Sequence, residues 1–360
     1  MNFSAPVNSL SFGYCSFHLL NQFFKRNIDL NLFPIGENID ISSYPAASLE
    51  FQEYLRKSAN NALDRFSRND KTLSLWHITN GSEQSFGTKR NLFTFFELSE
   101  LTPTEVNILN NQDTVFVTND YTKKVIDSQC KVEVVVAPLG FDNLHFKKLN
   151  RRPYNDDRIV FSLFGKLETA RKRHAKVIQN WIKKFGGDRR YQLHLHVYNP
   201  HLSPEQNSQL LSHIIGNKPF NVNILPHVRD LVFFNQNLNA ADIVMDLGTE
   251  GFSIPSFSAV ALGKHGVILN FAGLAQWANP VNSVMVNHTH MIEPFDNMFF
   301  HKGAKQNQGL IADFDENEFI AACEIAIDRF TQNPINIEGL KLQEKFNWSD
   351  TVDTVLNNLK

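Results

Sequence analysis

Short runs of apolar, β-branched residues alternate with longer amphipathic stretches along most of this chain. In the first half, three such runs stand out, at 72–78 (TLSLWHI), 113–118 (DTVFVT) and 132–139 (VEVVVAPL). We expect each of them to form a buried strand, because continuous apolar runs with polar borders are typical of sheets covered on both faces. Residues 50–66 (EFQEYLRKSANNALDRF) have the spacing of an amphipathic helix.

The alternation becomes more regular in the second half of the chain. Apolar runs occur at 159–165, 191–198, 221–226, 241–247 and 265–271. Helical patterns separate them, as at 174–185 and 204–215. Strands and helices that take turns predict βαβ units with a parallel sheet, so we expect each half to be a doubly wound α/β domain. Ligands of such sheets bind at the carboxyl ends of the strands, and a cleft between the halves is the expected site.

A chain of 360 residues fits two domains. The boundary is best placed in the polar, charged segment 146–158 (FKKLNRRPYNDDR), which contains a proline and has no apolar face to bury. We therefore assign the first domain to 1–147, a linker to 148–157 and the second domain to 158–338.

Composition limits the kinds of partner. Hydrophobic residues make up 42%, charged residues 20%, and the formal net charge of −2 gives no general attraction to nucleic acid or anionic membranes. The three cysteines, Cys15, Cys130 and Cys323, are few and far apart, which favours a reducing compartment. The N-terminus lacks a signal-peptide pattern, and no run reaches about 18 apolar residues. We expect a cytoplasmic protein, with peripheral attachment to a membrane as the second option.

Basic residues gather directly after one predicted strand. The segment 161–174 (FSLFGKLETARKRH) carries Lys166, Arg171, Lys172 and Arg173. Cations beyond a strand end are suited to holding a diphosphate. The alternative is the solvated basic start of a helix.

A second anion-binding element is predicted at 248–270 (GTEGFSIPSFSAVALGKHGVILN). Pro255 fits the first position of a helix, and Gly263 or Gly266 fits its end. The free amides and the positive dipole end would then lie above strand 241–247, facing the basic segment. Two phosphate-directed elements in one domain favour a nucleotide-diphosphate ligand.

These segments resemble a known family. EGFSIPSFSAVALGKHGVIL is similar to the E-G-F-G-L-P-x-x-E-A-M-A-x-G-x-P-V-I signature of retaining glycosyltransferases of family 4, and FGKLETARKRH to their G-K/R-x-E-x-R-K-x-H segment, with one extra residue. Further similar segments follow in the family's order over most of the chain: FTFFELSELTP (93–103), DTVFVTNDYTKKVI (113–126), VVVAPLGFDNLHF (134–146), NFAGLAQWANPVNSVMV (270–286) and KFNWSDTVDTVLNNL (345–359).

The resemblance implies a GT-B fold, in which two Rossmann-like domains face each other across a cleft, the first on the acceptor side and the second binding the donor. Residues 339–360 would form a helix that packs back toward the first domain. The expected activity is transfer of a sugar, with retention, from a nucleotide-diphosphate sugar to a glycan, a lipid-linked glycan, a protein or a small molecule. A phosphate oxygen of the leaving group takes the proton, so no general base, cofactor or metal is expected.

The resemblance also assigns residues. Lys166, with Arg171 or Lys172, would bind the donor diphosphate and stabilise the leaving group, and Glu250 would contact the donor sugar. The remaining donor-side residues are those of the turn, Gly251, Phe252, Ser253 and Ile254, together with Gly13 near the glycine-rich loop after the first strand. His77 is a candidate acceptor-side group, although a lone histidine at a strand end is more often structural.

Ser258 departs from the family pattern, which has a second glutamate there to bind the ribose of the nucleotide. A serine hydroxyl is short and neutral. The lost charge-assisted bond, roughly 1.5–3 kcal/mol, would weaken donor binding about tenfold to a hundredfold. The alternative function is therefore a non-catalytic nucleotide-sugar-binding or scaffolding partner with the same fold.

Three further patterns bear on metal and nucleic-acid binding. The DFD motif at 313–315 resembles a metal-binding motif, but Asp315 and Glu318 predict a capping box at a helix start. The histidines of 194–196 (HLH) and 287–290 (NHTH) lack partners at zinc spacing, so no metal site is predicted. A lesser alternative is a nucleic-acid acceptor contacted by Lys147, Lys148, Arg151 and Arg152, against which the overall charge argues.

Overall fold

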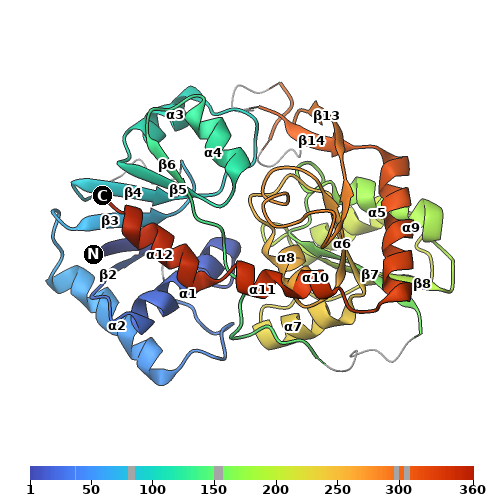
Figure 1. Cartoon of the computed structure of the whole chain (residues 1–360), viewed down its shortest axis with the longest axis horizontal. Coiled ribbons are helices and arrows are strands. Elements are labelled where there is room, and N and C mark those ends of the chain that lie inside the picture. The colour runs from blue at the N-terminus through green and yellow to red at the C-terminus, as the bar shows by residue number, and fades with distance from the viewer. Residues whose placement is uncertain (37, 80–85, 150–156, 296–299, 304–308) are drawn as a thin grey trace.

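The computed structural model describes residues 1–36, 38–79, 86–149, 157–295, 300–303 and 309–360. Two lobes lie side by side, and each contains a six-stranded sheet with helices packed around it (Figure 1). All pairs within both sheets are parallel. The expected α/β class with two doubly wound domains is confirmed.

The first lobe has the strand order β2-β1-β3-β4-β5-β6. Its strands are β1 (Asn2–Ala5), β2 (Asn31–Pro34), β3 (Lys71–Leu75), β4 (Lys89–Phe93), β5 (Thr114–Val117) and β6 (Glu133–Val136). Its helices are α1 (Ser11–Lys25), α2 (Leu49–Asp64), α3 (Pro103–Asn110) and α4 (Asp120–Asp127). The predicted strands appear as β3, β5 and β6, each shorter than its apolar run, and the predicted helix appears as α2.

The second lobe has the order β12-β11-β10-β7-β8-β9. Its strands are β7 (Ile159–Gly165), β8 (Tyr191–Val197), β9 (Val222–Ile224), β10 (Ile243–Asp246), β11 (His265–Leu269) and β12 (Val284–Val286). Its helices are α5 (His174–Phe185), α6 (Pro204–Ile215), α7 (Leu231–Ala240), α8 (Ile254–Ala261) and α9 (Glu316–Gln332). All five apolar runs predicted in this half form strands of the sheet. Because β7 and β10 are neighbours, the loops after them meet at one edge.

A small antiparallel pair, β13 (His288–Ile292) and β14 (Ile311–Phe314), stands beside the second sheet. The DFD motif ends this pair, and Asp315 caps α9 by accepting hydrogen bonds from the backbone N–H groups of Asn317 and Glu318. The reciprocal half of the predicted capping box is wrong. The Glu318 carboxylate instead accepts from the backbone N–H of Asn287 at 2.9 Å, because β13 begins next to it.

The C-terminal segment crosses from the second lobe to the first through α10 (Ile337–Leu340), α11 (Leu342–Lys345) and α12 (Trp348–Asn358) (Figure 1). Helix α12 lies against α1, where Asp353 pairs with Arg26 at 2.8 Å. Lys71 Nζ donates to the carbonyl of Leu359 at 2.7 Å, at the start of β3. The end of the chain is thus part of the first lobe. Most of the predicted linker, 150–156, lies outside the described residues.

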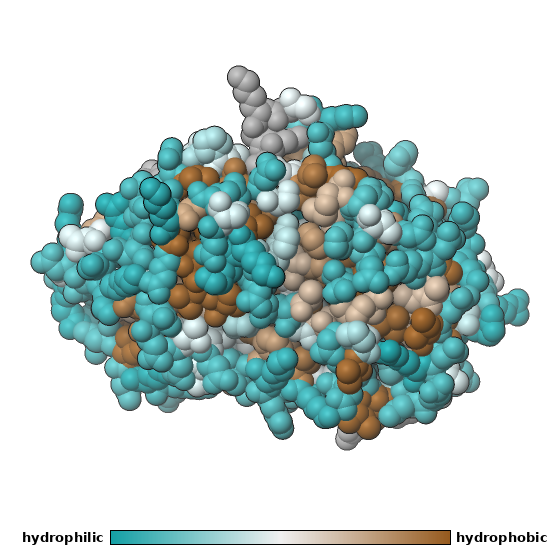
Figure 2. Space-filling model, turned by 45° about the horizontal axis from the view of Figure 1, so that its top comes forward, coloured by the Kyte–Doolittle hydropathy of each residue, from teal (hydrophilic) through white to brown (hydrophobic). Residues whose placement is uncertain are grey.

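No helix within the described ranges is long and apolar enough to cross a membrane. Figure 2 shows one face of the molecule on which hydrophilic residues predominate and hydrophobic ones form separate patches.

Candidate functional site

The loop between β7 and α5 carries the basic residues found in the sequence. Strand β7 ends at Gly165, whose φ of +118° only glycine adopts without strain. The loop then runs through Lys166, Arg171 and Lys172 to Arg173, which begins α5 in a left-handed conformation. This path turns Arg171 and Lys172 toward the loop after β10, while Lys166 pairs with Glu168 of its own loop.

The turn between β10 and α8 is fixed by a buried carboxylate. Asp246, the last residue of β10, accepts hydrogen bonds from the hydroxyls of Ser253 and Ser256, the latter at 2.7 Å. Ser253 adopts a positive φ of 63° immediately before the helix. Pro255 is the second residue of α8, one position later than predicted, because the helix begins at Ile254. Gly263, with a φ of +88°, follows its last turn, whereas Gly266 lies within β11.

The two loops are bonded to each other. Glu250 pairs with Lys172 through one carboxylate oxygen and with Arg171 Nη1 through the other, at 3.2 Å. Arg171 Nη1 also donates to the carbonyl of Thr249 at 2.8 Å, and the Thr249 amide donates back to the carbonyl of Arg171 at 2.9 Å. The structure therefore brings together Glu250, Arg171 and Lys172, which lie about 80 residues apart in the sequence.

Two further carboxylates complete this set. Glu168 lies 3.3 Å from Lys166 and 3.6 Å from Arg171, and Glu97 of the first lobe lies 3.5 Å from Arg171. We call Lys166, Arg171, Lys172, Glu97, Glu168 and Glu250 the charge cluster. Neither Glu97 nor Glu168 was predicted as a site residue, although both lie in segments that resemble the family, 93–103 and 164–174.

Burial and neighbouring charges set the protonation states of the charge cluster. Burial disfavours the charged form of Glu250, but Lys172 and Arg171 outweigh it and lower its pKa to about 2. Arg171 is likewise buried, yet the pKa of its guanidinium is raised by Glu250, Glu97 and Glu168. Burial raises the pKa of Glu97. Glu250 is therefore an anion near neutral pH, and Glu97 is the carboxylate most easily protonated.

Arg173, the fourth cation of the basic segment, is directed elsewhere. Its guanidinium pairs with Asp313 at 2.9 Å, and Lys176 binds the same carboxylate at 3.0 Å. These cations lower the pKa of Asp313 against the effect of its burial. The first aspartate of the DFD motif thus anchors the start of α5 to β14.

The turn after Glu250 is held from the first lobe. The carbonyl of Gly251 accepts from Thr118 Oγ1 at 2.5 Å and from Asn119 Nδ2 at 2.8 Å. The carbonyl of Phe252 accepts from the indole N–H of Trp277 at 2.7 Å, and Ile254 begins α8. These bonds leave the turn with little freedom.

Ser258 lies in the second turn of α8 and is only 1% exposed. Its hydroxyl has no hydrogen-bond partner within the described part of the chain. The Ser258 hydroxyl is therefore not presented at the surface of this structure.

The first-lobe candidates lie in different settings. His77 is exposed and its ring packs on Phe12 at 4.6 Å, and its pKa is lowered by partial desolvation and by the positive charges of Lys166 and Arg171. Gly13 lies in the first turn of α1, where a Cβ atom would come 2.3 Å from the backbone oxygen of Asn8. Glycine is thus required there by the close approach of the loop after β1.

Side chains of the kinds that can ligate a metal come together at one place among the described residues, the buried group His18, Asp142 and His145. Asp142 accepts from the backbone N–H groups of Leu144 and His145 at 3.0 Å and from His145 Nδ1 at 2.8 Å, and His18 Nε2 lies 3.2 Å away. These contacts occupy both carboxylate oxygens, as in a hydrogen-bonded turn. The histidines of β8 are packing residues: His194 bonds to Gln192 and His196 stacks on Phe164 at 4.4 Å.

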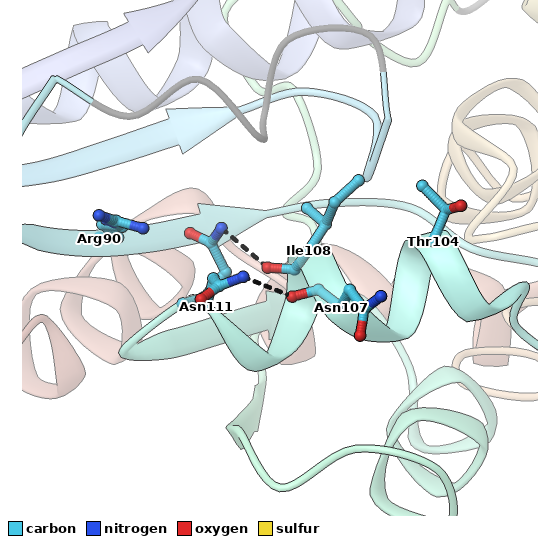
Figure 3. A pocket seen from close by; sticks show the side chains of 6 residues that line it. Arg90, Thr104, Asn107, Ile108 and Asn111 are labelled. Carbon is cyan, nitrogen blue, oxygen red and sulfur yellow. Dashed lines mark hydrogen bonds between the residues drawn. The ribbon is translucent and has the colours of Figure 1, made fainter.

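Two surface hollows lie away from the charge cluster. One, of about 180 Å³, is formed where α3 ends, and the bonds of Asn111 to Asn107 and Ile108 close that helix (Figure 3). It is smaller than the roughly 300–1,000 Å³ typical of ligand pockets. The other, of about 400 Å³, lies between α1, residues 141–144 and the start of α12.

No protein-family model matches the chain, and no curated protein matches its sequence. Solved structures do match. Sucrose-phosphate synthase from Thermosynechococcus elongatus has a TM-score of 0.67 at 14% identity, covering 99% of this chain and 97% of that one. The trehalose-6-phosphate protein from E. coli, bound to UDP-2-fluoroglucose, has 0.64 at 12%, covering 100% and 99%. HepE from Anabaena, in complex with UDP and glucose, has 0.63 at 15%, covering 100% and 99%. Since these proteins are GT-B glycosyltransferases, and identity this low speaks for the fold alone, the chain has the GT-B fold.

Proposed function

We propose that this protein is a glycosyltransferase that moves a sugar from a nucleotide-diphosphate sugar to a hydroxyl acceptor, with retention at the anomeric carbon. The observation that carries the proposal is the pairing of Arg171 and Lys172 with Glu250 at the carboxyl ends of β7 and β10, beside the N-terminus of α8, with Lys166 joined to this set through Glu168. Cations and a helix N-terminus together suit a diphosphate. The two GT-B structures solved with UDP and a glucose ligand support a donor of this kind.

Each residue then has a defined task. Lys166 and Arg171 bind the diphosphate and stabilise the negative charge that builds on it as the bond to the sugar breaks. Glu250, held as an anion by Lys172, accepts hydrogen bonds from hydroxyls of the donor sugar. The acceptor oxygen attacks the anomeric carbon from the side that the diphosphate leaves, and a phosphate oxygen takes the proton. These residues supply the charge stabilisation that a divalent ion would otherwise give, so we propose metal independence.

Membership of glycosyltransferase family 4 and a cytoplasmic location are part of the same proposal. The family assignment depends on the motifs at 164–174 and 250–269, both of which lie at the charge cluster. The proposed acceptor is a compound that carries a hydroxyl group.

The test is release of nucleotide from donor sugars. The protein is incubated with UDP-, GDP- and ADP-sugars and a broad mixture of acceptors, with and without EDTA. We expect release from one donor, unchanged by EDTA and reduced at least tenfold by Lys166→Ala. Binding of a donor without release of nucleotide in any mixture would contradict the proposal that the protein is an enzyme.

A second candidate is a nucleotide-sugar-binding protein without catalysis. It is favoured by Ser258, which is buried and replaces the ribose-binding glutamate of the family pattern. The same experiment separates the two, because this candidate predicts donor binding with no release.

A further inference from the structure

Glu97 alone, of the six residues in the charge cluster, comes from the first lobe. It follows β4, and its side chain is 25% exposed, compared with 4% for Glu168 and 8% for Glu250. Its oxygen lies 3.5 Å from Arg171 Nη1, a nitrogen that already bonds Thr249 at 2.8 Å and Glu250 at 3.2 Å. Glu97 is thus the most accessible of the three carboxylates around Arg171, and on the shared Nη1 it lies farther away than Glu250.

The charge balance of the cluster makes this contact exchangeable. Three cations face three carboxylates. A diphosphate that binds Arg171 adds negative charge, so a carboxylate must either move away or take a proton. Glu168 and Glu250 are fixed by burial and by Lys166 and Lys172. Glu97 is the carboxylate that can leave Arg171 when a diphosphate binds.

The surroundings of Glu97 indicate what it would bind after release. A Cβ atom on Gly251 would lie 3.5 Å from the Glu97 oxygen, so this carboxylate stands beside the turn that precedes α8. On the same wall of the first lobe, Phe12 packs on Phe95 at 4.8 Å and on His77 at 4.6 Å. Phe12 is itself buried, whereas Phe95 is partly accessible and His77 is exposed. Accessible rings can pack against the C–H groups of a sugar, and a carboxylate accepts hydrogen bonds from its hydroxyls.

We propose that Glu97 changes partner during the reaction. It pairs with Arg171 in the ligand-free protein, and it receives the hydroxyl of a carbohydrate acceptor once the donor diphosphate has taken Arg171. The acceptor oxygen then forms its bond to the anomeric carbon as the bond from that carbon to the diphosphate breaks, and the hydroxyl proton passes to the departing phosphate oxygen. This inference depends on the proposed function and adds to it the acceptor class and the order of binding, donor first.

The experiment measures donor and acceptor binding separately. Dissociation constants for UDP-glucose, GDP-mannose and ADP-glucose are measured by calorimetry on the wild type, Glu97→Gln and Glu100→Gln. Glu100 is an exposed carboxylate three positions along the same loop and gives the same charge change away from Arg171. We expect Glu97→Gln to bind the accepted donor about tenfold more tightly, because the amide competes less for Arg171, and Glu100→Gln to match the wild type.

Transfer to a panel of mono- and disaccharides supplies the second readout. Glu97→Gln should raise the acceptor KM or lower transfer at least tenfold while donor binding is tightened, a combination that loss of structure does not produce. If Glu97→Gln fails to fold, Glu97→Asp is the second variant. Its side chain is one methylene shorter, which moves the carboxylate away from Arg171, so it should also tighten donor binding.

The outcomes separate the two proposals. A wild type that binds none of the donors contradicts the proposed function, and this inference with it. A wild type that binds donor while Glu97→Gln binds equally or more weakly overturns the exchange alone. Tighter donor binding with unchanged transfer overturns the acceptor role.

Discussion

Asn119 of the first lobe donates a hydrogen bond from Nδ2 to the carbonyl oxygen of Gly251 in the second lobe, at 2.8 Å. Its other amide atom, Oδ1, accepts from the backbone N–H of Thr122 and caps α4. One buried side chain therefore joins the end of β5, the start of α4 and the turn before α8. The geometry of the candidate donor site depends on both lobes.

Replacing Asn119 separates these two roles. Asn119→Asp keeps the cap but places a carboxylate oxygen against the Gly251 carbonyl, and we expect a loss of about 1–3 kcal/mol in the free energy of unfolding. Asn119→Ser keeps a capping oxygen without the charge and should cost about 1 kcal/mol. Urea denaturation measures both. Wild-type stability of both variants would show that the contact between the lobes contributes nothing.

Changing Glu250 should separate donor-sugar contact from diphosphate binding. Glu250→Gln removes charge-assisted bonds worth about 1.5–3 kcal/mol, so nucleotide release should fall about tenfold to a hundredfold. Binding of UDP should persist, because Lys166 and Arg171 remain, whereas Lys166→Ala should weaken it. Calorimetry with UDP and an assay of donor turnover measure the two effects. Glu316→Gln, an exposed change on α9, is the matched control, and wild-type turnover in Glu250→Gln would place the site elsewhere.

Ser258 offers a test of the ribose position. Its hydroxyl is buried and unpaired within the described residues, so Ser258→Ala should leave UDP affinity within about twofold and stability within about 1 kcal/mol of the wild type. Calorimetry and thermal unfolding check this. A tenfold loss of UDP affinity would mean that α8 shifts to present the hydroxyl to the ribose.

The stability of the protein should fall in mild acid because of His174. Burial, followed by the charge of Lys172, lowers its pKa to about 3, and its Nδ1 accepts the backbone N–H of Glu168 at 3.3 Å. The unfolded chain binds that proton near pH 6.5, so the folded state has its full stability above about pH 6.5 and loses about 1.4 kcal/mol per pH unit below it, toward pH 3.

Urea midpoints at pH 7.5 and 5.5 measure this slope. His174→Asn keeps an acceptor near the Glu168 amide but cannot titrate, so its stability should change less between these pH values. If the stability of His174→Asn falls with pH as steeply as that of the wild type, other groups cause the acid sensitivity.

Local sequence patterns were enough to predict those helices and strands whose formation depends on their own residues. The run 159–165 became β7 because continuous apolar residues suit a strand covered on both faces, and Pro255 fixed the first turn of α8. The short strands β1, β2 and β4 were not singled out, since their four or five residues include asparagines that are paired only by distant partners. Asn2, for example, is bonded to Thr72 and Asn31.

Part of the candidate site could be predicted from local sequence patterns as well. Cations after one strand and a helix start after another indicate a site wherever those strands are neighbours, so Lys166, Arg171, Lys172 and Glu250 could be named. Arg173 could not be set apart from them, because its partner Asp313 is 140 positions away.

The sequence by itself determined the alternation of strands and helices, the two parallel sheets and the chemistry of the loops after β7 and β10, because these follow from periodicity and from residue types a few positions apart. Only the tertiary structure decided which charges pair. It placed Glu97 against Arg171 across the lobes, turned Arg173 to Asp313 and buried Ser258 in α8. Ion pairs and burial depend on distances in space, which a linear pattern does not contain.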